Sequence, residues 1–446
     1  IEDSRKYYLI RHFINFLFFI VAIYFFFLLI YNRYNSWILA ILGSTFLFLT
    51  PRIFAQSFYN NKDIIFMSLF IICMYAAVSF LQKPSYKNSV FFSIASALTV
   101  DVRILGIILP ILVLIFYTIN IFHDINYKKN TFKPLIVFLI LTPFFIISFW
   151  PYLWEDPLTN FITTFKNYSQ FDVNIYNFYL GEHINARNVP WHYPIIWIFV
   201  STPLFYLSLF VIGFIFIFRR LIKRILRIEK NDPYSDIWRG NKEAQDLVFF
   251  SIFVVPLFCV IIFNSTLYDG WRHLYFIYPS FLMISLFGLH IIKILFFKKN
   301  TNLLIILSFL LLSPTIVWML KNHPYQYVYF NFLAGKNFNT KFDMDYWGLS
   351  NANALKHIAE NENRNVKISN VGTTDLHISK AFIPTSYRNK LTIINETINS
   401  DYIINNYRDW LGKNINQEFR IPINYEVFYE IIIDGVPINT IYKKVK

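Results

Sequence analysis

Charged side chains are scarce in this chain: they make up 15% of its 446 residues, while hydrophobic side chains make up 56%. An average soluble domain is about 25% charged and about 45–50% apolar. The few charges lie in the gaps between apolar runs of about 20 residues, the length that a helix needs to cross a bilayer. This pattern excludes an ordinary soluble protein and predicts an integral membrane protein, with the lipid bilayer as a partner.

Cysteine and acidic residues are also few. The chain has two cysteines, Cys73 and Cys259, and each lies inside an apolar run, so neither a disulfide nor a cysteine-ligated metal is predicted. Aspartate and glutamate number 27 against 41 lysines and arginines, which gives a net charge of +14. The basic residues lie mostly in gaps between apolar runs, where membrane orientation accounts for them. No nucleic-acid partner is predicted.

Hydrophobic runs predict the membrane segments. The ten segments are residues 9–31, 36–50, 64–82, 89–101, 103–122, 133–150, 193–218, 246–264, 273–296 and 302–319. Segment 89–101 is shorter than a full span, but helices that border a polar cavity can be short. We interpret 89–122 as two short crossings that meet near Asp101 and Arg103, because one long helix would move the most basic loop to the outside.

Alternate gaps between these segments differ in positive charge. One set of gaps holds 17 Lys and Arg residues, eight of them in 219–242, whereas the opposite set holds nine over more residues. Because positively charged loops remain in the cytoplasm, the first set is predicted to be cytoplasmic. The N-terminal residues, the loops 51–63, 151–192 and 265–272, and everything after residue 320 are then outside the cytoplasm, in a protein of the plasma (inner) membrane.

The composition changes near residue 320 to that of a soluble domain. We therefore predict a mostly helical transmembrane domain over 1–319 and a small external α/β domain over 320–446. In the second domain, Ser350 is predicted to cap a helix over 351–361.

Strand-like runs alternate with this helix. Residues 366–371 and 401–407 are predicted to form strands. Asp434 and Gly435 separate two further strand-like runs and form the dipeptide that is typical of a type I′ hairpin turn.

Polar residues beside membrane segments are costly, so they are candidates for function. The candidate substrate-binding residues on the external edge are Arg11, His12, Arg52, Lys62, Asp101, Arg103, Tyr268, Asp269, Arg272 and His273. Some have structural alternatives: Arg11 and Lys62 can snorkel to the interface, and Asp101 with Arg103 can form a structural ion pair. Together they suit an anionic, amphiphilic substrate such as a phosphate-bearing lipid, because arginine binds phosphate oxygens in a bidentate manner.

A second acidic pattern lies in the external domain. Asp343-Met344-Asp345 matches the D-x-D of nucleotide-sugar transferases, in which carboxylates bind a metal ion on a diphosphate. Here the pattern lacks a Gly-rich loop and lies outside the cytoplasm, where nucleotide sugars are absent. We regard the metal-binding interpretation as the weaker one.

At the external residues the chain resembles the C-type membrane glycosyltransferases, the protein-mannosyltransferase and aminoarabinose-transferase-like superfamily. PRIFAQSFYNNKD (51–63) looks like the second external loop of that class, and ALTVDVRILGIILP (97–110) looks like its paired short helices. YDGWRHLYFIYP (268–279) resembles its late arginine-bearing helix start, and residues 323–350 resemble the junction to an external domain. The resemblance covers nearly the whole chain and rests on order, spacing and topology together.

The resemblance implies transfer of a sugar from a polyprenyl-phosphate donor to a lipid, glycan or protein acceptor outside the cytoplasm. Asp63 matches one of the two external acidic sites of such enzymes and is the candidate catalytic residue. The other acid is expected upstream of Ile1, after a further transmembrane helix, since Glu2 and Asp3 are poor substitutes.

Arg272, Arg103 and Arg11 are expected near the leaving phosphate, and Asp63 is expected to orient the acceptor or to hold a divalent cation. The resemblance does not fix whether a cation is required. A polytopic transporter or lipid flippase of cell-envelope glycan assembly is the alternative function, and a noncatalytic membrane scaffold is a third.

Overall fold

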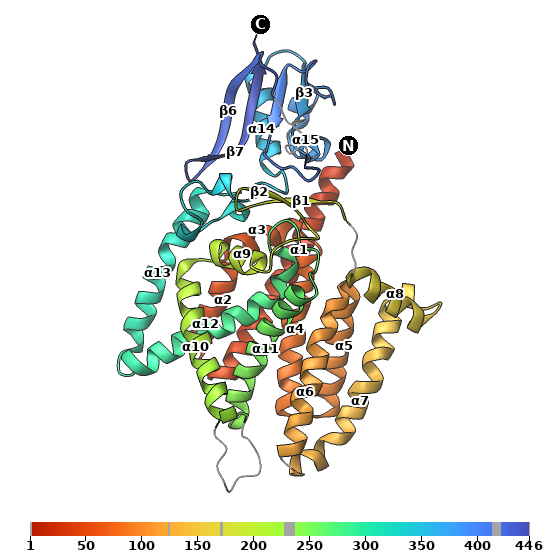
Figure 1. Ribbon diagram of the computed structural model, residues 1–446, viewed down its shortest axis with the longest axis vertical. Coiled ribbons are helices and arrows are strands. Elements are labelled where there is room, and N and C mark those ends of the chain that lie inside the picture. The colour runs from red at the N-terminus through yellow and green to blue at the C-terminus, as the bar shows by residue number, and fades with distance from the viewer. Residues whose placement is uncertain (1, 124, 170–172, 227–236, 413–420, 446) are drawn as a thin grey trace.

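The computed structural model describes residues 2–123, 125–169, 173–226, 237–412 and 421–445. Within these residues, a bundle of long helices carries a smaller domain with a β-sheet at one end (Figure 1). Eight helices in the described part are long and apolar enough to cross a membrane. The prediction of a mostly helical membrane protein with a small C-terminal α/β domain is confirmed.

Each predicted apolar segment contains at least one helix. The helices of the first 321 residues are α1 (Glu2–Tyr34), α2 (Trp37–Phe48), α3 (Pro51–Tyr59), α4 (Asp63–Gln82), α5 (Tyr86–Val102), α6 (Ile108–His123), α7 (Ile125–Phe149), α8 (Pro157–Ser169), α9 (Tyr193–Ser201), α10 (Leu204–Leu226), α11 (Gly240–Ile262), α12 (Tyr278–Phe296) and α13 (Thr301–Lys321). Helices α2 and α3 are bent by 66° at the residues between them and together are long enough for one further span.

The break between α5 and α6 falls where the sequence indicated it. Arg103 has extended backbone angles, φ −150° and ψ 128°, and ends α5, after which a short 3-10 turn (Ile104–Ile107) leads into α6. The 17 residues of α5 pack between α4 and α7. The prediction of two short helices that meet near Arg103 is confirmed.

Two expectations about local structure were wrong. Residues 51–63 are not a continuous loop, because α3 begins at Pro51. Proline is favourable at the first position of a helix, since the backbone N–H at that position forms no hydrogen bond within the helix. Segment 193–218 is not one helix, because Thr202 and Pro203 interrupt it between α9 and α10. Thr202 has extended backbone angles, which the residue before a proline prefers.

Helices α10 and α12 approach each other at two glycines. A Cβ atom on Gly213 would lie 2.0 Å from the carbonyl oxygen of Ile284, and one on Gly288 would lie 2.1 Å from that of Leu209. Only glycine permits backbones to come this close. The contact fixes α12, whose first turn follows Arg272, against its neighbour in the bundle.

A buried ion cluster lies at the end of the bundle away from the C-terminal domain. Arg33 of α1 donates to both oxygens of Asp246 of α11 at 2.6 and 2.8 Å, and Arg220 of α10 donates to the same carboxylate at 3.0 Å. Asp246 is 3% exposed. The basic loop predicted over 219–242 borders this cluster, but residues 227–236 lie outside the described part of the chain.

The C-terminal domain holds a five-stranded sheet. Its elements are α14 (Ser350–Asn361), β3 (Val366–Asn370), α15 (Leu376–Phe382), α16 (Thr385–Arg388), β4 (Leu391–Ile393), β5 (Tyr402–Asn405), β6 (Tyr425–Ile433) and β7 (Val436–Lys444). The strand order is β4-β3-β5-β7-β6. Strand β3 is parallel to its neighbours β4 and β5. Strand β7 is antiparallel to its neighbours β5 and β6.

The hairpin β6–β7 forms as predicted. Asp434 (φ 52°) and Gly435 (φ 81°) both have the positive φ that a type I′ turn requires. The prediction that Ser350 caps α14 was wrong, since Ser350 is the first residue of the helix and its hydroxyl donates to Asp345.

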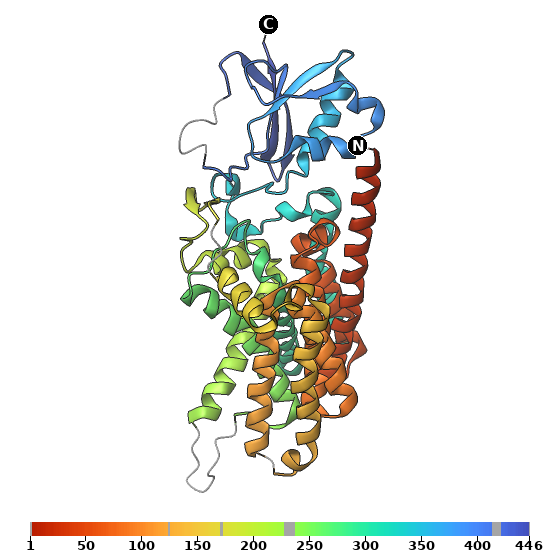
Figure 2. The same cartoon turned by 90° about the vertical axis from the view of Figure 1, so that its right-hand side faces the viewer.

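Several contacts connect the bundle to this domain, among them one through α1 and one through a small sheet. Helix α1 extends beyond the other helices to the level of α15 (Figure 2), where the ring of Tyr8 lies 5.5 Å from that of Phe382. A two-stranded sheet of β1 (Tyr176–Tyr179) and β2 (Glu182–Asn185) lies between the bundle and the domain (Figure 1), and Tyr179 pairs with Phe342 in an isolated bridge.

Candidate active site

Helix α4 begins at the end of the bundle that faces the C-terminal domain (Figure 1), and Asp63 is its first residue. The side chain of Asn60 donates to Asp63 Oδ2 at 2.8 Å, and the Asp63 backbone N–H donates to Asn60 Oδ1 at 3.0 Å. Gln56 accepts from the same Asn60 amide at 2.7 Å and donates to the hydroxyls of Tyr275 and Tyr346. This polar network fixes a carboxylate that is 2% exposed.

Two arginines from distant segments converge on Asp63. Arg103 Nη2 donates to Asp63 Oδ1, and Arg272 Nη1 donates to Asp63 Oδ2 at 2.9 Å. The three side chains are at most 11% exposed, and a buried charge requires such a partner. The alternative in which Arg103 pairs with Asp101 is not the arrangement found, because Arg103 turns toward α4.

The ion pairs continue into the C-terminal domain. Arg272 Nη2 lies 3.2 Å from Asp269 Oδ2, and Asp269 Oδ1 accepts from Arg408 Nη2 at 2.6 Å. Arg408 Nη1 lies 2.7 Å from Asp343 Oδ1. Six side chains thus alternate in charge, and we call them the ion-pair chain: Arg103, Asp63, Arg272, Asp269, Arg408 and Asp343.

The D-x-D residues have structural contacts here. Asp343 Oδ2 accepts from the backbone N–H of Phe178 at 2.9 Å in addition to its pair with Arg408. Asp345 accepts hydrogen bonds from Tyr327, from Ser350 and from the backbone N–H of Leu349. Burial raises the pKa of Asp345 to about 6. The two carboxylates are therefore engaged at the junction between the domains.

Three nitrogen atoms at and near Arg272 are buried and have no hydrogen-bond partner among the described residues. They are the N–H donors Arg272 Nε and Trp347 Nε1, and the Nδ1 atom of His273, which donates or accepts according to the tautomer of the ring. The Arg272 guanidinium lies 5.7 Å from the centre of the Trp347 ring and 4.7 Å from that of Tyr268, whose ring also contacts His273. Unpartnered buried donors cost free energy that an anionic ligand would offset.

Of the candidate substrate-binding residues, Arg103, Asp269 and Arg272 join Asp63 in the ion-pair chain, and Tyr268 and His273 line it. Arg52 lies over the rings of Trp197 and Phe330. It is 1% exposed, donates through Nε to the carbonyl oxygen of Tyr329 at 3.0 Å and leaves Nη2 without a hydrogen-bond partner among the described residues.

The remaining candidates lie elsewhere. Arg11 stacks on Tyr8, and the ring of His12 stacks on Phe382 of the C-terminal domain at 6.0 Å, so both contribute to the contact between α1 and α15. Lys62 is exposed. Both carboxylate oxygens of Asp101 are buried without a partner among the described residues. The side chains of Glu2 and Asp3 lie outside the described residues.

The side chains at Asp63 do not form a cation site in this arrangement. Both of its oxygens accept hydrogen bonds from arginine or asparagine, so a cation would have to displace one of them. In the described part of the chain, no group of three or more His, Cys, Asp and Glu residues is placed to hold a metal ion.

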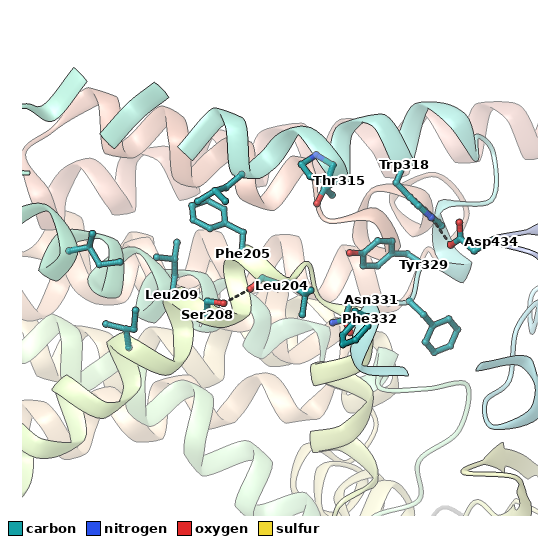
Figure 3. A pocket seen from close by; sticks show the side chains of 15 residues that line it. Leu204, Phe205, Ser208, Leu209, Thr315, Trp318, Tyr329, Asn331, Phe332 and Asp434 are labelled. Atoms are coloured by element: carbon teal, nitrogen blue, oxygen red, sulfur yellow. Dashed lines mark hydrogen bonds between the residues drawn. The ribbon is translucent and has the colours of Figure 1, made fainter. Parts of the chain in front are cut away.

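An apolar groove lies apart from these charges. It has a volume of about 620 Å³ and runs between α10, α12 and α13 to the residues that follow α13 (Figure 3). At its polar end, Trp318 Nε1 donates to Asp434 of the β6–β7 turn at 2.7 Å (Figure 3). The groove contains none of the residues of the ion-pair chain.

Several residues of this site were not among the candidates predicted from the sequence. Asn60 had a local signal, since an asparagine side chain just before a helix often accepts a hydrogen bond from a nearby backbone N–H, as Asn60 does from Asp63. Trp347 lies within the stretch 323–350, which the sequence indicated only as the junction between the domains. Arg408 had no local signal, because it is distant in sequence from the membrane segments and only the fold brings it to Asp269.

Comparison with known proteins gives a structural likeness only. No family model matches the chain, and no curated protein matches it. Among solved structures, the chain is similar to ArnT from Cupriavidus metallidurans in the apo state, with a TM-score of 0.42 and 12% identity over 97% of this chain and 83% of the other. It is also similar to the same protein bound to undecaprenyl phosphate, with a TM-score of 0.40 and 11% identity over 96% and 82%.

At TM-scores below 0.5 the likeness establishes neither a family nor an activity for this chain.

Proposed function

We propose that this protein is a membrane glycosyltransferase that moves a sugar from a polyprenyl-phosphate donor to a lipid, glycan or protein acceptor on the extracytoplasmic side of the plasma (inner) membrane. The observation that carries the proposal is the set of unpartnered N–H donors around Arg272, at the end of the bundle where the helices meet the C-terminal domain. These donors favour an anionic ligand, and their position at the end of apolar, membrane-length helices favours a ligand that reaches the site from the bilayer. A lipid phosphate has both properties.

Arg272 and Arg103 are suited to the phosphate of the donor. Each guanidinium presents five N–H donors in a planar fork that matches phosphate oxygens. Arg272 uses two nitrogens on carboxylates and keeps Nε free for a ligand. Two positive charges in a buried site favour the transition state, because negative charge grows on the phosphate as it leaves.

The proposed reaction exchanges one bond at the anomeric carbon of the sugar. An acceptor hydroxyl oxygen forms a bond to that carbon while the bond to the phosphate oxygen breaks, and the phosphate leaves with the electron pair. Without ligand, Asp63 balances the charges of Arg103 and Arg272. The incoming phosphate takes over part of this role, which frees an Asp63 oxygen to accept the proton of the hydroxyl or to orient it.

The experiment compares wild-type protein and Asp63→Asn in membranes supplied with an isotope-labelled polyprenyl-phosphate sugar. We expect transfer of the label by the wild type and at least a 100-fold slower transfer by Asp63→Asn at similar expression. Glu155→Gln, an exposed carboxylate at the same end of the bundle, is the matched control and should transfer normally. Movement of intact labelled donor across the membrane without transfer would instead identify a flippase.

A further inference from the structure

Arg408 belongs to the C-terminal domain but reaches the site of the membrane domain. It lies three residues after β5, and its side chain is 1% exposed. Its carbonyl oxygen accepts from the backbone N–H and the hydroxyl of Thr373, and its guanidinium lies 5.6 Å from the centre of the Trp410 ring. These contacts hold the arginine firmly within its own domain.

The guanidinium of Arg408 joins two carboxylates from different segments. One is Asp343, in the junction between the domains, and the other is Asp269, in the loop before α12. Burial alone would lower the pKa of Arg408, but Asp343 and Asp269 together raise it above its ordinary value. The side chain therefore remains charged and binds both carboxylates across the physiological pH range.

Asp269 is held in a backbone conformation that is uncommon for residues other than glycine. Its φ is 58°, in the left-handed region, and Gly270 follows with φ 72°. The loop is tied down by Asn177 of β1, which accepts from the Asp269 backbone N–H at 3.1 Å and donates to the carbonyl oxygen of Leu267 at 2.8 Å. Such outliers persist when their surroundings fix them, and they occur often at functional sites.

The position of Asp269 affects the orientation of Arg272. Its Nη2 atom contacts Asp269, and its Nη1 atom contacts Asp63, so the two carboxylates together set the plane of the guanidinium and the direction of its free Nε. The second oxygen of Asp269 accepts a hydrogen bond from Arg408, so Arg408 helps to fix the orientation of the carboxylate that contacts Arg272.

We propose that Arg408 is a positioning residue: through Asp269 it orients Arg272, so the C-terminal domain sets the affinity of the membrane site for a phosphate-bearing lipid. This inference rests on the proposed function for the identity of the ligand, but not for the effect of Arg408 on Arg272. The alternative is a purely structural role, in which Arg408 only fastens the C-terminal domain to the junction.

The first test measures Arg272 directly and needs no substrate. Purified full-length protein is treated with an arginine-directed dicarbonyl reagent, and the modification of Arg272 is followed by peptide mass spectrometry. We expect Arg408→Gln to raise the modification rate of Arg272 at least fivefold. Arg364→Gln is the matched control, because Arg364 forms an exposed ion pair with Asp401 in the same domain, and it should leave the rate unchanged.

The second test measures KM for the polyprenyl-phosphate sugar and kcat separately. Arg408→Gln should raise KM at least tenfold while kcat changes less than threefold, and Arg408→Lys should recover part of the affinity. Asp343→Asn keeps the contact between Arg408 and Asp269, so it should change KM less than threefold. A merely structural anchor would be equally sensitive to both changes and would lower the yield of folded protein without a selective effect on KM.

Arg408→Gln leaves two buried carboxylates near each other, so the double variant Arg408→Gln with Asp343→Asn takes its place if the single variant does not fold. Wild-type reactivity of Arg272 and wild-type KM in either variant would overturn the proposal. If the wild type neither binds nor transfers the lipid-linked sugar, the proposed function fails. The rate of Arg272 modification still decides the role of Arg408 in that case.

Discussion

Replacing Arg272 with lysine separates charge from geometry at the proposed phosphate site. The arginine contacts Asp63 at 2.9 Å and Asp269 at 3.2 Å through its two terminal nitrogens and keeps Nε without a partner. A lysine retains the positive charge, but its single ammonium cannot bridge both carboxylates and also present a fork to a phosphate. The substitution should therefore weaken binding of the donor while the site remains electrically balanced.

The expected loss of affinity for the donor follows from the hydrogen bonds that a lysine at position 272 cannot make. A hydrogen bond that involves a charged group contributes about 1.5–3 kcal/mol. Removal of one such bond to the phosphate corresponds to about 10- to 150-fold weaker binding, at about 1.4 kcal/mol for each factor of ten. The missing bond to Asp269 affects the free protein and the complex alike, so it should appear mainly as a lower thermal stability.

The assay is the dissociation constant of a polyprenyl phosphate for purified protein in detergent, followed by protein fluorescence or calorimetry. Arg5→Lys is the matched control, since Arg5 is exposed near the start of α1 and should bind the lipid as the wild type does. Equal affinity of the wild type and Arg272→Lys would refute the assignment and leave Arg272 as a structural partner of Asp63 and Asp269.

Three further predictions concern topology, stability and pH. In a background without Cys73 and Cys259, Lys336→Cys should react with an impermeant thiol reagent in intact cells and Lys87→Cys should not; the reverse pattern would invert the proposed orientation. Asp246→Asn leaves Arg33 and Arg220 without their buried carboxylate and should cost about 3–5 kcal/mol of stability, whereas Glu360→Gln at an exposed ion pair should cost less than about 1 kcal/mol. Burial raises the pKa of Asp345 to about 6, so the folded protein binds its proton more tightly than the unfolded chain, and stability should fall as the pH rises from about 4 to about 6. Asp345→Asn should remove this pH dependence of the thermal midpoint. Parallel curves of thermal midpoint against pH for the two proteins would contradict the raised pKa of Asp345.

The sequence by itself determined where the helices and several turns form, because these depend on neighbouring residues. Apolar runs long enough for a bilayer indicated the membrane helices, and the polar pair Asp101 and Arg103 marked the break between α5 and α6. Asp434 and Gly435 specified the β6–β7 hairpin, since both tolerate positive φ. Polar residues beside the apolar runs identified Asp269 and Arg272 as candidates at one edge of the membrane domain, and the family resemblance of the sequence implied Asp63.

Only the tertiary structure decided which charges meet. Arg103 has an acid two residues away in Asp101, yet it pairs with Asp63, 40 positions earlier, because its extended backbone directs it toward α4. Arg408 reaches Asp269 from 139 positions away and has no local pattern that links it to the membrane. Ion pairs form between side chains that the packing of helices and domains brings within about 4 Å. The number of residues between two charges in the sequence does not indicate whether they come this close. The sequence therefore determined the candidate residues, and the fold determined how they are paired.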